Sequence, residues 1–170
     1  MVVEICHAVG VSVESMVRKI HLAFGDEGEF IQDTIEDEEL TDPDRAVEFV
    51  NNTGVDALVI SVGTEPGSYL TGKQPEIVSP LLAEISNCVD SVPLVVNGGS
   101  AIPDNDLRKM KAFPVAKLNI GSMLRATFRD SLFNSIHENP HIDMREALKK
   151  AEKATQKVVL EKIRLLSSSA

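Results

Sequence analysis

Four short apolar runs along the chain predict the strands of a parallel sheet. Two runs, Ala57–Gly63 and Pro93–Asn97, are almost continuously apolar, Ala116–Ile120 is shorter, and Val11–Glu14 is a β-branched run that follows Gly10. A strand with one solvated face alternates apolar and polar residues, whereas an unbroken apolar strand is covered on both faces. The pattern therefore favours an α/β fold with helices packed over a parallel sheet.

The segments between these runs carry the signals that start and stop helices. Asp42 is a capping residue, Pro43 stands at the first helical position, and Gly54 follows as a stop for a helix that ends near residue 52. Further helices are expected at about 76–88, where Pro80 delays the start, at 104–111, and at 122–137 before Pro140.

The clearest helix is the last one. Asp143 and Glu146 have the spacing of a capping box at its start. The residues expected on its buried face are Leu148, Ala151, Ala154, Val158 and Ile163. The Ser-rich tail beyond it is expected to fray.

Composition and charge exclude some classes of function. The chain has 170 residues, 43% of them hydrophobic, and a net charge of -9 with no Trp and one Tyr. Proteins that bind nucleic acids present basic faces or aromatic side chains on which bases stack. This chain is acidic and poor in Trp and Tyr, so nucleic-acid binding is not expected. No apolar run approaches the ~18 residues of a membrane helix, and the N-terminus does not resemble a signal peptide. We expect one domain over residues 1–170 in the cytoplasm.

Several reactive residue types are interpreted as structural. The two cysteines, Cys6 and Cys88, have no metal-site or disulfide spacing and are expected to be small buried hydrophobes. The acidic segment Asp26–Asp42 is interpreted as a solvated loop rather than a cation site, because it lacks calcium-loop spacing. The four histidines match no catalytic or metal motif and are taken as surface or structural residues: His7, His21, His137 and His141.

The chemistry of a parallel α/β fold is expected where the strands end. The third run is followed by Gly98, Gly99 and Ser100, and the fourth leads through Gly121 and Ser122 directly into a helix. Glycines allow backbone N–H groups to approach an anion, and a helix N-terminus favours negative charge. A phosphate site and a pair of tight structural turns explain these residues about equally well.

Only one residue at a strand end is positioned as an acid or base. Glu65 follows the second run. A solvent-facing loop carboxylate remains the favoured interpretation of Glu65, because nothing in the pattern supplies a partner for it.

Several motifs, in order along the chain, resemble those of the class II, zinc-dependent aldolases that act on fructose or tagatose bisphosphate. The matching segments are Gly-Val-Ser-Val-Glu at 10–14, Leu-Thr-Asp-Pro at 40–43, Thr-Gly-Val-Asp-Ala-Leu at 53–58, Gly-Gly-Ser-x-Ile-Pro at 98–103, Val-Ala-Lys-Leu-Asn at 115–119 and Leu-Arg-x-x-Phe at 124–128. The resemblance implies a TIM (β/α)8 barrel, of which this chain would form roughly the C-terminal half, with four strand-helix units.

The resemblance also implies a substrate site. In the family, histidines hold a zinc ion that polarises the carbonyl of dihydroxyacetone phosphate and stabilises the enediolate, and an aspartate from an earlier strand handles a proton. Contacts to the ketose phosphate would fall on Gly67, Gly98, Gly99, Ser100, Asn119, Ile120, Gly121 and Ser122.

The chain differs from the family at positions that would bind the metal. Pro66 and Asn97 stand at two positions where the family has zinc-binding histidines, and Met16 replaces a glutamate. Proline cannot bind zinc, and an amide oxygen is a poor ligand beside imidazole. By the resemblance, the chain begins in the helix before the fifth strand, so the catalytic aspartate is not in it. We expect no catalytic residue, and absent or weak zinc binding.

Half of a barrel leaves two open sheet edges and uncovered apolar surface. Two copies could pair into a pseudo-barrel, a separate chain could supply the first half as a complementary half-barrel, or the sequence could be a fragment of a larger aldolase. The function expected from the resemblance is reversible aldol cleavage that gives dihydroxyacetone phosphate, with this isolated chain inactive. The alternative is a non-catalytic protein, a pseudoenzyme, that binds a sugar phosphate.

Overall fold

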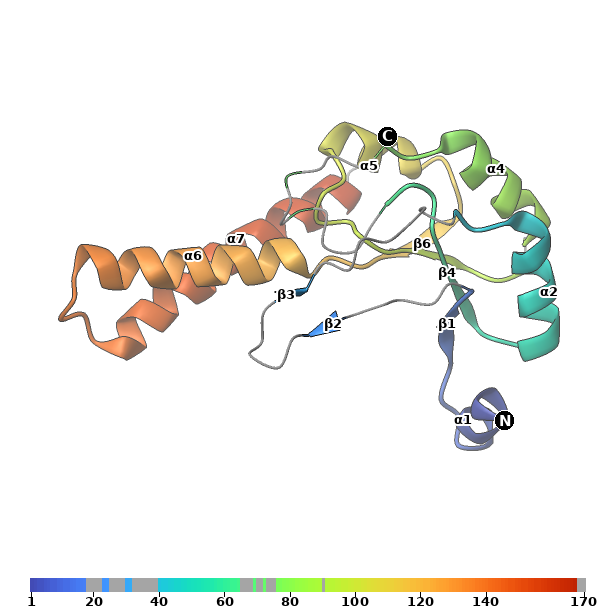
Figure 1. Ribbon diagram of the computed structural model, residues 1–170, viewed down its shortest axis with the longest axis horizontal. Helices are drawn as coiled ribbons and strands as arrows, with labels where there is room; N and C mark the ends of the chain where they lie inside the picture. The colour runs from blue at the N-terminus through green and yellow to red at the C-terminus, as the bar shows by residue number, and fades with distance from the viewer. Residues whose placement is uncertain are drawn as a thin grey trace.

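The computed structural model describes residues 1–17, 23–24, 30–31, 40–64, 69, 72, 76–89 and 91–167. Its helices and strands alternate along most of the chain (Figure 1). In order they are α1 (Val2–Ala8), β1 (Glu14–Met16), β2 (Ala23–Phe24), β3 (Phe30–Ile31), α2 (Pro43–Thr53), β4 (Ala57–Ile60), α4 (Ser79–Cys88), β5 (Leu94–Val96), α5 (Asp104–Met110), β6 (Val115–Leu118), α6 (Ser122–Glu138) and α7 (Met144–Ser167).

Four strands form one parallel sheet in the order β1-β4-β5-β6, which is also their order along the chain. The helices α2, α4 and α5 arch over one face of this sheet (Figure 1). The predicted strand-helix alternation is therefore confirmed. The antiparallel pair of β2 and β3 was not predicted, and β1 begins at Glu14, where the predicted run ended.

The main apolar core lies between the sheet and these helices. Leu58 and Ile60 on β4 and Leu94 and Val96 on β5 are fully buried, as are Leu82 and Ile85 of α4 and Leu107 of α5. Side chains alternate between the faces of a strand, so Val59 and Val95 point to the other face. They are nevertheless only 5% and 1% exposed. The two central strands, β4 and β5, are therefore buried on both faces, as their unbroken apolar runs indicated, whereas the edge strands β1 and β6 are partly exposed.

An ion pair shows how strongly the sheet curls. Lys117 Nζ on β6 donates to Glu14 Oε2 on β1 at 2.7 Å, although β4 and β5 lie between these two edge strands. In a flat sheet three strand spacings of about 4.8 Å would separate the edges by about 14 Å, with both side chains pointing out of the plane. The pair can close only because both side chains point into the concave face of a rolled sheet. Such a curvature is that of a barrel wall.

The helix ends follow the predicted signals. The Asp42 carboxylate accepts from the backbone N–H of Arg45 at 2.8 Å, and Gly54 ends α2 in the left-handed conformation with φ 68°. The helix α4 begins at Ser79, with Pro80 in its first turn. At the start of α7, the Asp143 carboxylate accepts from the backbone N–H of Arg145 at 2.8 Å. These capping bonds fix the helix boundaries locally.

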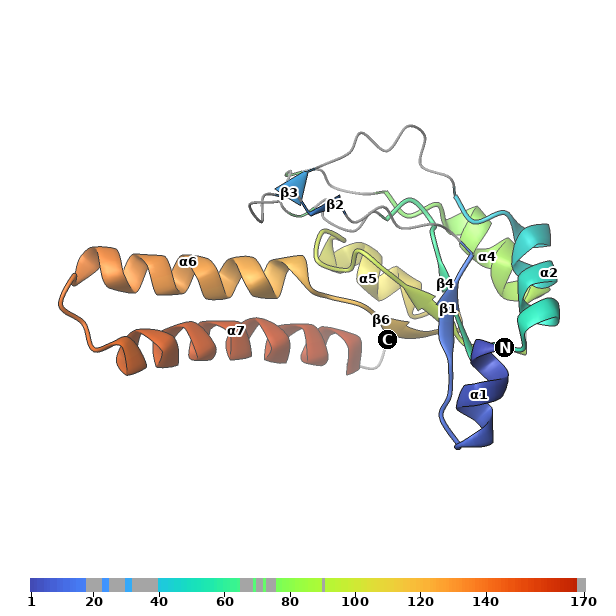
Figure 2. The ribbon, with the colours of Figure 1, turned by 60° about the horizontal axis from the view of Figure 1, so that its bottom comes forward.

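The predicted buried face of α7 was partly wrong. The helices α6 and α7 form a long antiparallel hairpin that projects from the sheet (Figure 2). In it Ala147 and Ala151 are buried, but Leu148 and Ile163 are 42% and 52% exposed. The small alanines let the two backbones approach closely, so the larger side chains lie beside the contact. None of the helices in the described part of the chain combines the length and apolarity needed to span a bilayer.

The cysteines and histidines were predicted with mixed success. Cys6 and Cys88 are free thiols, but Cys88, at the last turn of α4, is exposed and Cys6 is half-buried, so the expected burial of both was wrong.

His7 is structural as predicted: its Nε2 lies 2.8 Å from Asp56 Oδ2. His141 lies beyond the end of α6 and therefore shares no helical face with His137. His21 lies outside the described residues.

Asp56 gives the fold a pH dependence. The hydrogen bond from His7, together with one from the backbone N–H of Val13, holds the pKa of the Asp56 carboxyl below its ordinary value. A pKa that is lower in the folded protein means that the carboxylate stabilises the fold above the unfolded pKa of about 3.9, and that this contribution is lost as the pH falls through the folded value. Asp56→Asn should therefore lower the melting temperature at pH 6, and the difference from the wild type should shrink below about pH 4. A difference that stays constant from pH 6 to pH 3 would show that the charge of Asp56 is not involved.

Candidate functional site

A glycine turn follows β5 and is hydrogen-bonded to the residue after β6. Gly98 has φ 77°, a conformation that favours glycine. The backbone N–H of Gly99 donates to the carbonyl oxygen of Asn119 at 3.1 Å. A Cβ on Gly99 would lie 2.7 Å from Leu118 Cγ, so the lack of a side chain there lets the turn lie against β6. The two strand ends that were identified separately in the sequence thus form one structure.

Ser100 connects this turn to the start of α6. Its Oγ accepts from the backbone N–H groups of Gly121 and Met123, both at 3.2 Å. Ser100 is 5% exposed and Ser122 is 9% exposed, so the junction is largely out of solvent. The first N–H groups of a helix have no partner within the helix and carry its positive dipole end. The junction therefore brings together two such N–H groups and a hydroxyl.

Arg125 adds a positive charge that the sequence prediction did not include among the site residues. A Cβ on Gly121 would lie 3.7 Å from Arg125 Nη2, which places the guanidinium next to the start of α6. The helix spacing was a usable signal, because a residue four positions after Gly121 lies one turn along the same face. The site thus has a cation as well as N–H and O–H groups.

An amide pair lies at the strand ends beside the turn. Asn119 Nδ2 donates to Asn97 Oδ1 at 2.8 Å, and Asn97 Nδ2 is 4.0 Å from Met16 Sδ. Asn119 and Asn97 directly follow β6 and β5, and Met16 is the last residue of β1, so the curled sheet brings its two edges together at this level. All three are uncharged. They can orient a ligand by hydrogen bonds but supply no charge.

A buried polar atom lies shortly after β4, without a hydrogen-bond partner among the described residues. Thr64 is 2% exposed, and no hydrogen-bond partner of its Oγ1 is found in the part of the chain described here. By contrast, the backbone N–H of nearby Ser61 has a partner, because it donates to Thr41 Oγ1 at 2.8 Å. Three residues singled out in the sequence follow at once and lie outside the described residues, namely Glu65, Pro66 and Gly67.

The structure therefore brings seven of the eight predicted contact residues into one region, at the ends of β5 and β6. They are Gly98, Gly99, Ser100, Asn119, Ile120, Gly121 and Ser122. Comparison with known proteins shows the family of the chain as a whole. The model of the family described as fructose-bisphosphate aldolase class-II matches residues 1–170. The chain belongs to the class II aldolase family.

Relatives of known sequence agree with this membership. The D-tagatose-1,6-bisphosphate aldolase subunit GatY of Klebsiella oxytoca is 34% identical over 162 residues, which cover 95% of this chain and 55% of GatY. The chain thus spans about half the length of this relative.

Solved structures show the same coverage. The YdjI aldolase of Escherichia coli K12 matches with a TM-score of 0.69 and 28% identity over 98% of this chain and 52% of its own. A putative fructose-1,6-bisphosphate aldolase from Coccidioides immitis matches with a TM-score of 0.74 over 96% of this chain and 55% of its own, at 24% identity, and so supports the fold alone. Together with the rolled four-stranded sheet, these matches confirm the expected half of a TIM-type barrel.

Class II aldolases are in general zinc-dependent, and the residues described here do not fit that ion. Within the described ranges, no three His, Cys, Asp or Glu side chains gather as a metal-ligand group. The amide oxygen of Asn97 already accepts a hydrogen bond from Asn119 Nδ2 at 2.8 Å. The neighbouring thioether of Met16 is a soft ligand and carries no charge. This end of the site therefore offers hydrogen bonds in place of zinc ligands.

Proposed function

We propose that this chain binds a sugar phosphate, with dihydroxyacetone phosphate or a ketose bisphosphate as the ligand, through the junction of Ser100 with the start of α6. The hydrogen bonding of Ser100 is the observation that carries the proposal. A serine hydroxyl has two acceptor sites and one donor. The N–H groups of Gly121 and Met123 both donate to Ser100 Oγ. Its own proton is thus the group left to bind a further acceptor, and a phosphate oxygen is such an acceptor.

The surroundings of Ser100 suit an anion better than a neutral ligand. The positive end of the α6 dipole and the guanidinium of Arg125 lie on the same side of the junction. The planar guanidinium of arginine can bind a phosphate through two parallel N–H···O hydrogen bonds, a bidentate arrangement. The net charge of the chain is -9, so this local positive potential opposes the charge of the whole molecule. Such a contrast favours a specific anion site over general attraction.

The carbonyl end of the ligand would meet the amide pair. After donating to Asn97, Asn119 has its Oδ1 and a second N–H without a partner among the described residues, so it can orient a hydroxyl or carbonyl group. Aldol cleavage produces an enediolate, whose negative charge the family stabilises with a metal ion. Neutral amides stabilise that charge far less. We therefore propose that the chain alone binds the ligand without cleaving it.

The second candidate function is aldol cleavage itself, and family membership is what favours it. Metal analysis of the purified 170-residue chain, with a coupled assay for cleavage of fructose and tagatose bisphosphates, separates the two. The proposal predicts less than stoichiometric zinc after dialysis and no turnover above the uncatalysed rate. Stoichiometric zinc with turnover that chelation removes would establish the aldolase function instead.

A further inference from the structure

The concave face of the rolled sheet carries an ion pair. Residues that are paired in register across a sheet have their side chains on the same face. The register places Met16, Val59, Val95 and Lys117 in one row across the four strands. Glu14 lies two residues before Met16 and therefore on the same face, and its Oε2 accepts from Lys117 Nζ at 2.7 Å. The ion pair thus lies across the concave face, from β6 to β1.

The amide pair of the candidate site lies on this face too, one row nearer the carboxyl ends of the strands. Asn97 and Asn119 come two residues after Val95 and Lys117, a step of about 7 Å along a strand. The pairing of the strands extends to this row, because the N–H of Asn119 donates to a carbonyl oxygen of β5 at 2.9 Å. Asn97 Nδ2 is also 4.0 Å from Met16 Sδ, in the row of Lys117. The ion pair is therefore next to the amides.

The ammonium group of Lys117 keeps part of its hydrogen-bonding capacity. An ammonium has three N–H donors, and Glu14 accepts from one of them in the part of the chain described here. The side chains of Lys117 and Glu14 are 53% and 31% exposed, so a ligand at the amide pair can approach the ammonium. The pair has no net charge. It therefore offers a directed hydrogen bond rather than the positive charge of a metal ion.

Three kinds of polar group follow one another between β6 and α6. Gly121 supplies an N–H group that is bonded to Ser100, Asn119 supplies an amide, and Lys117 supplies an ammonium. Dihydroxyacetone phosphate has its own groups in a matching order: a phosphate, a carbonyl and a hydroxyl. A ligand whose phosphate lies at Ser100 and whose carbonyl lies at Asn119 would bring its last oxygen toward Lys117.

We propose that Lys117 is the residue by which the site distinguishes a hydroxyketone phosphate from inorganic phosphate. Its ammonium would donate a hydrogen bond to the oxygen at the end of the ligand away from the phosphate. The inference rests on the proposed binding of phosphate at Ser100 and adds the group that selects what the phosphate is attached to. Glu14 holds the ammonium on the concave face, and the remaining N–H groups of Lys117 meet the ligand.

Calorimetric titrations with two ligands test this role. The wild-type chain should bind dihydroxyacetone phosphate more tightly than inorganic phosphate. Lys117→Met keeps most of the length of the side chain and removes the ammonium. It should weaken the binding of dihydroxyacetone phosphate by about tenfold, as expected for one hydrogen bond to a charged group, and leave the binding of inorganic phosphate within about twofold. Lys117 is half-exposed, so the fold should survive, as an unchanged circular dichroism spectrum would verify.

Glu14→Gln separates a contact with the ligand from a structural role of the ion pair. This variant removes the same ion pair but keeps the ammonium. If Lys117 contacts the ligand, Glu14→Gln should bind dihydroxyacetone phosphate at least as tightly as the wild type. An equal loss in Glu14→Gln and Lys117→Met would overturn the proposal, because the pair would then act only by holding β1 near β6.

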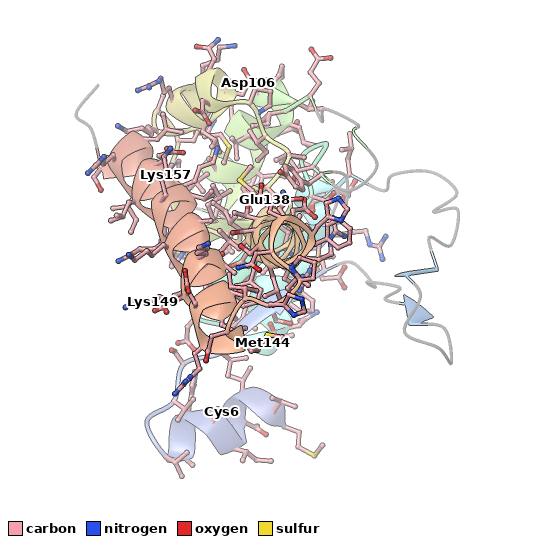
Figure 3. The ribbon with its side chains drawn as sticks, turned by 90° about the vertical axis from the view of Figure 1, so that its left-hand side faces the viewer. Cys6, Asp106, Glu138, Met144, Lys149 and Lys157 are labelled. Atoms are coloured by element: carbon pink, nitrogen blue, oxygen red, sulfur yellow. The ribbon has the colours of Figure 1, made fainter. Side chains whose placement is uncertain are left out.

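Lys109→Met is the control for charge. Lys109 Nζ lies 2.8 Å from Asp106 Oδ1 within α5, and the lysine side chain is 63% exposed. Figure 3 shows Asp106 at the top of the molecule, in the helical layer outside the sheet. This variant changes the net charge as Lys117→Met does, and it should bind both ligands within about twofold of the wild type. A matching loss of dihydroxyacetone phosphate binding in the two variants would overturn the proposal.

The two ligands also distinguish a failure of this inference from a failure of the proposed function. A wild type that binds both ligands equally, or a Lys117→Met variant that binds both as the wild type does, would overturn the role of Lys117 alone. A wild type that binds neither ligand at millimolar concentration would overturn the phosphate site itself, and this inference with it.

Discussion

Replacing Gly63 with alanine is expected to lower the free energy of unfolding by about 3–5 kcal/mol, the sum of a strained backbone conformation and overpacking. Gly63 follows β4 and has φ 92°, outside the range that alanine adopts without strain. A Cβ there would lie 2.2 Å from the carbonyl oxygen of Glu76. That oxygen belongs to the backbone segment that pairs with the end of β4, where the Val78 N–H donates to the Val62 carbonyl at 3.0 Å. The clash therefore cannot be relieved by a side-chain rotation.

Gly54→Ala separates the two causes. Gly54 also has a positive φ, 68°, but no atom of the described residues lies within 4 Å of its Cβ position. This variant should lose only the conformational term of about 1–2 kcal/mol. Thermal or urea unfolding of both variants measures the difference. Equal losses for the two variants would mean that the approach of Glu76 to Gly63 adds nothing.

Replacing Arg125 with glutamine is expected to weaken the binding of dihydroxyacetone phosphate by about ten- to hundredfold. A hydrogen bond to a charged group contributes about 1.5–3 kcal/mol, and 1.4 kcal/mol is a factor of ten in affinity. Glutamine keeps much of the length and hydrogen-bonding capacity of arginine but removes the charge. The guanidinium lies next to Gly121, so its loss acts at the start of α6 and not on the core. Titration calorimetry of both proteins measures the change.

Arg129→Gln is the control for charge. Arg129 lies one turn further along α6, where its Nη2 is 2.8 Å from Asp130 Oδ1 on the exposed surface. Both variants change the net charge equally, so a long-range effect on anion binding would appear in both. We expect Arg129→Gln to bind within about twofold of the wild type, because exposed ion pairs contribute little. An equal loss in both variants would argue against a direct contact from Arg125.

The parts of the fold that depend on local chemistry were predictable from the sequence. The apolar runs of β4 and β5 are buried on both faces, and α2 starts and ends at Asp42 and Gly54 as their capping chemistry requires. The strand β1 starts three residues later than predicted, because its register comes from pairing with Ala57–Val59, which the sequence of the strand does not encode. The hydrophobic pattern predicts whether a segment is a helix or a strand better than it predicts which strand that segment pairs with.

Longer-range packing explains the remaining differences. Leu148 and Ile163 were assigned to the buried face of α7 by their spacing, but α6 packs on the alanine side of the helix. In the candidate site, the glycines and serines were singled out because strand ends carry the ligand sites of parallel folds, and their role remains a prediction. Arg125 was not singled out, because the position of its guanidinium beside Gly121 at the start of α6 is seen only in the folded chain. The bonding of Ser100 to two N–H groups likewise became visible only in three dimensions.

Calorimetric titration of the EDTA-treated chain with dihydroxyacetone phosphate tests the central claim most directly. The claim is that the junction of Ser100 and α6 binds the phosphate without a metal ion. The account predicts saturable binding with one site per chain and an affinity that added zinc leaves unchanged. No heat of binding at millimolar ligand, or binding that appears only when zinc is restored, would contradict it.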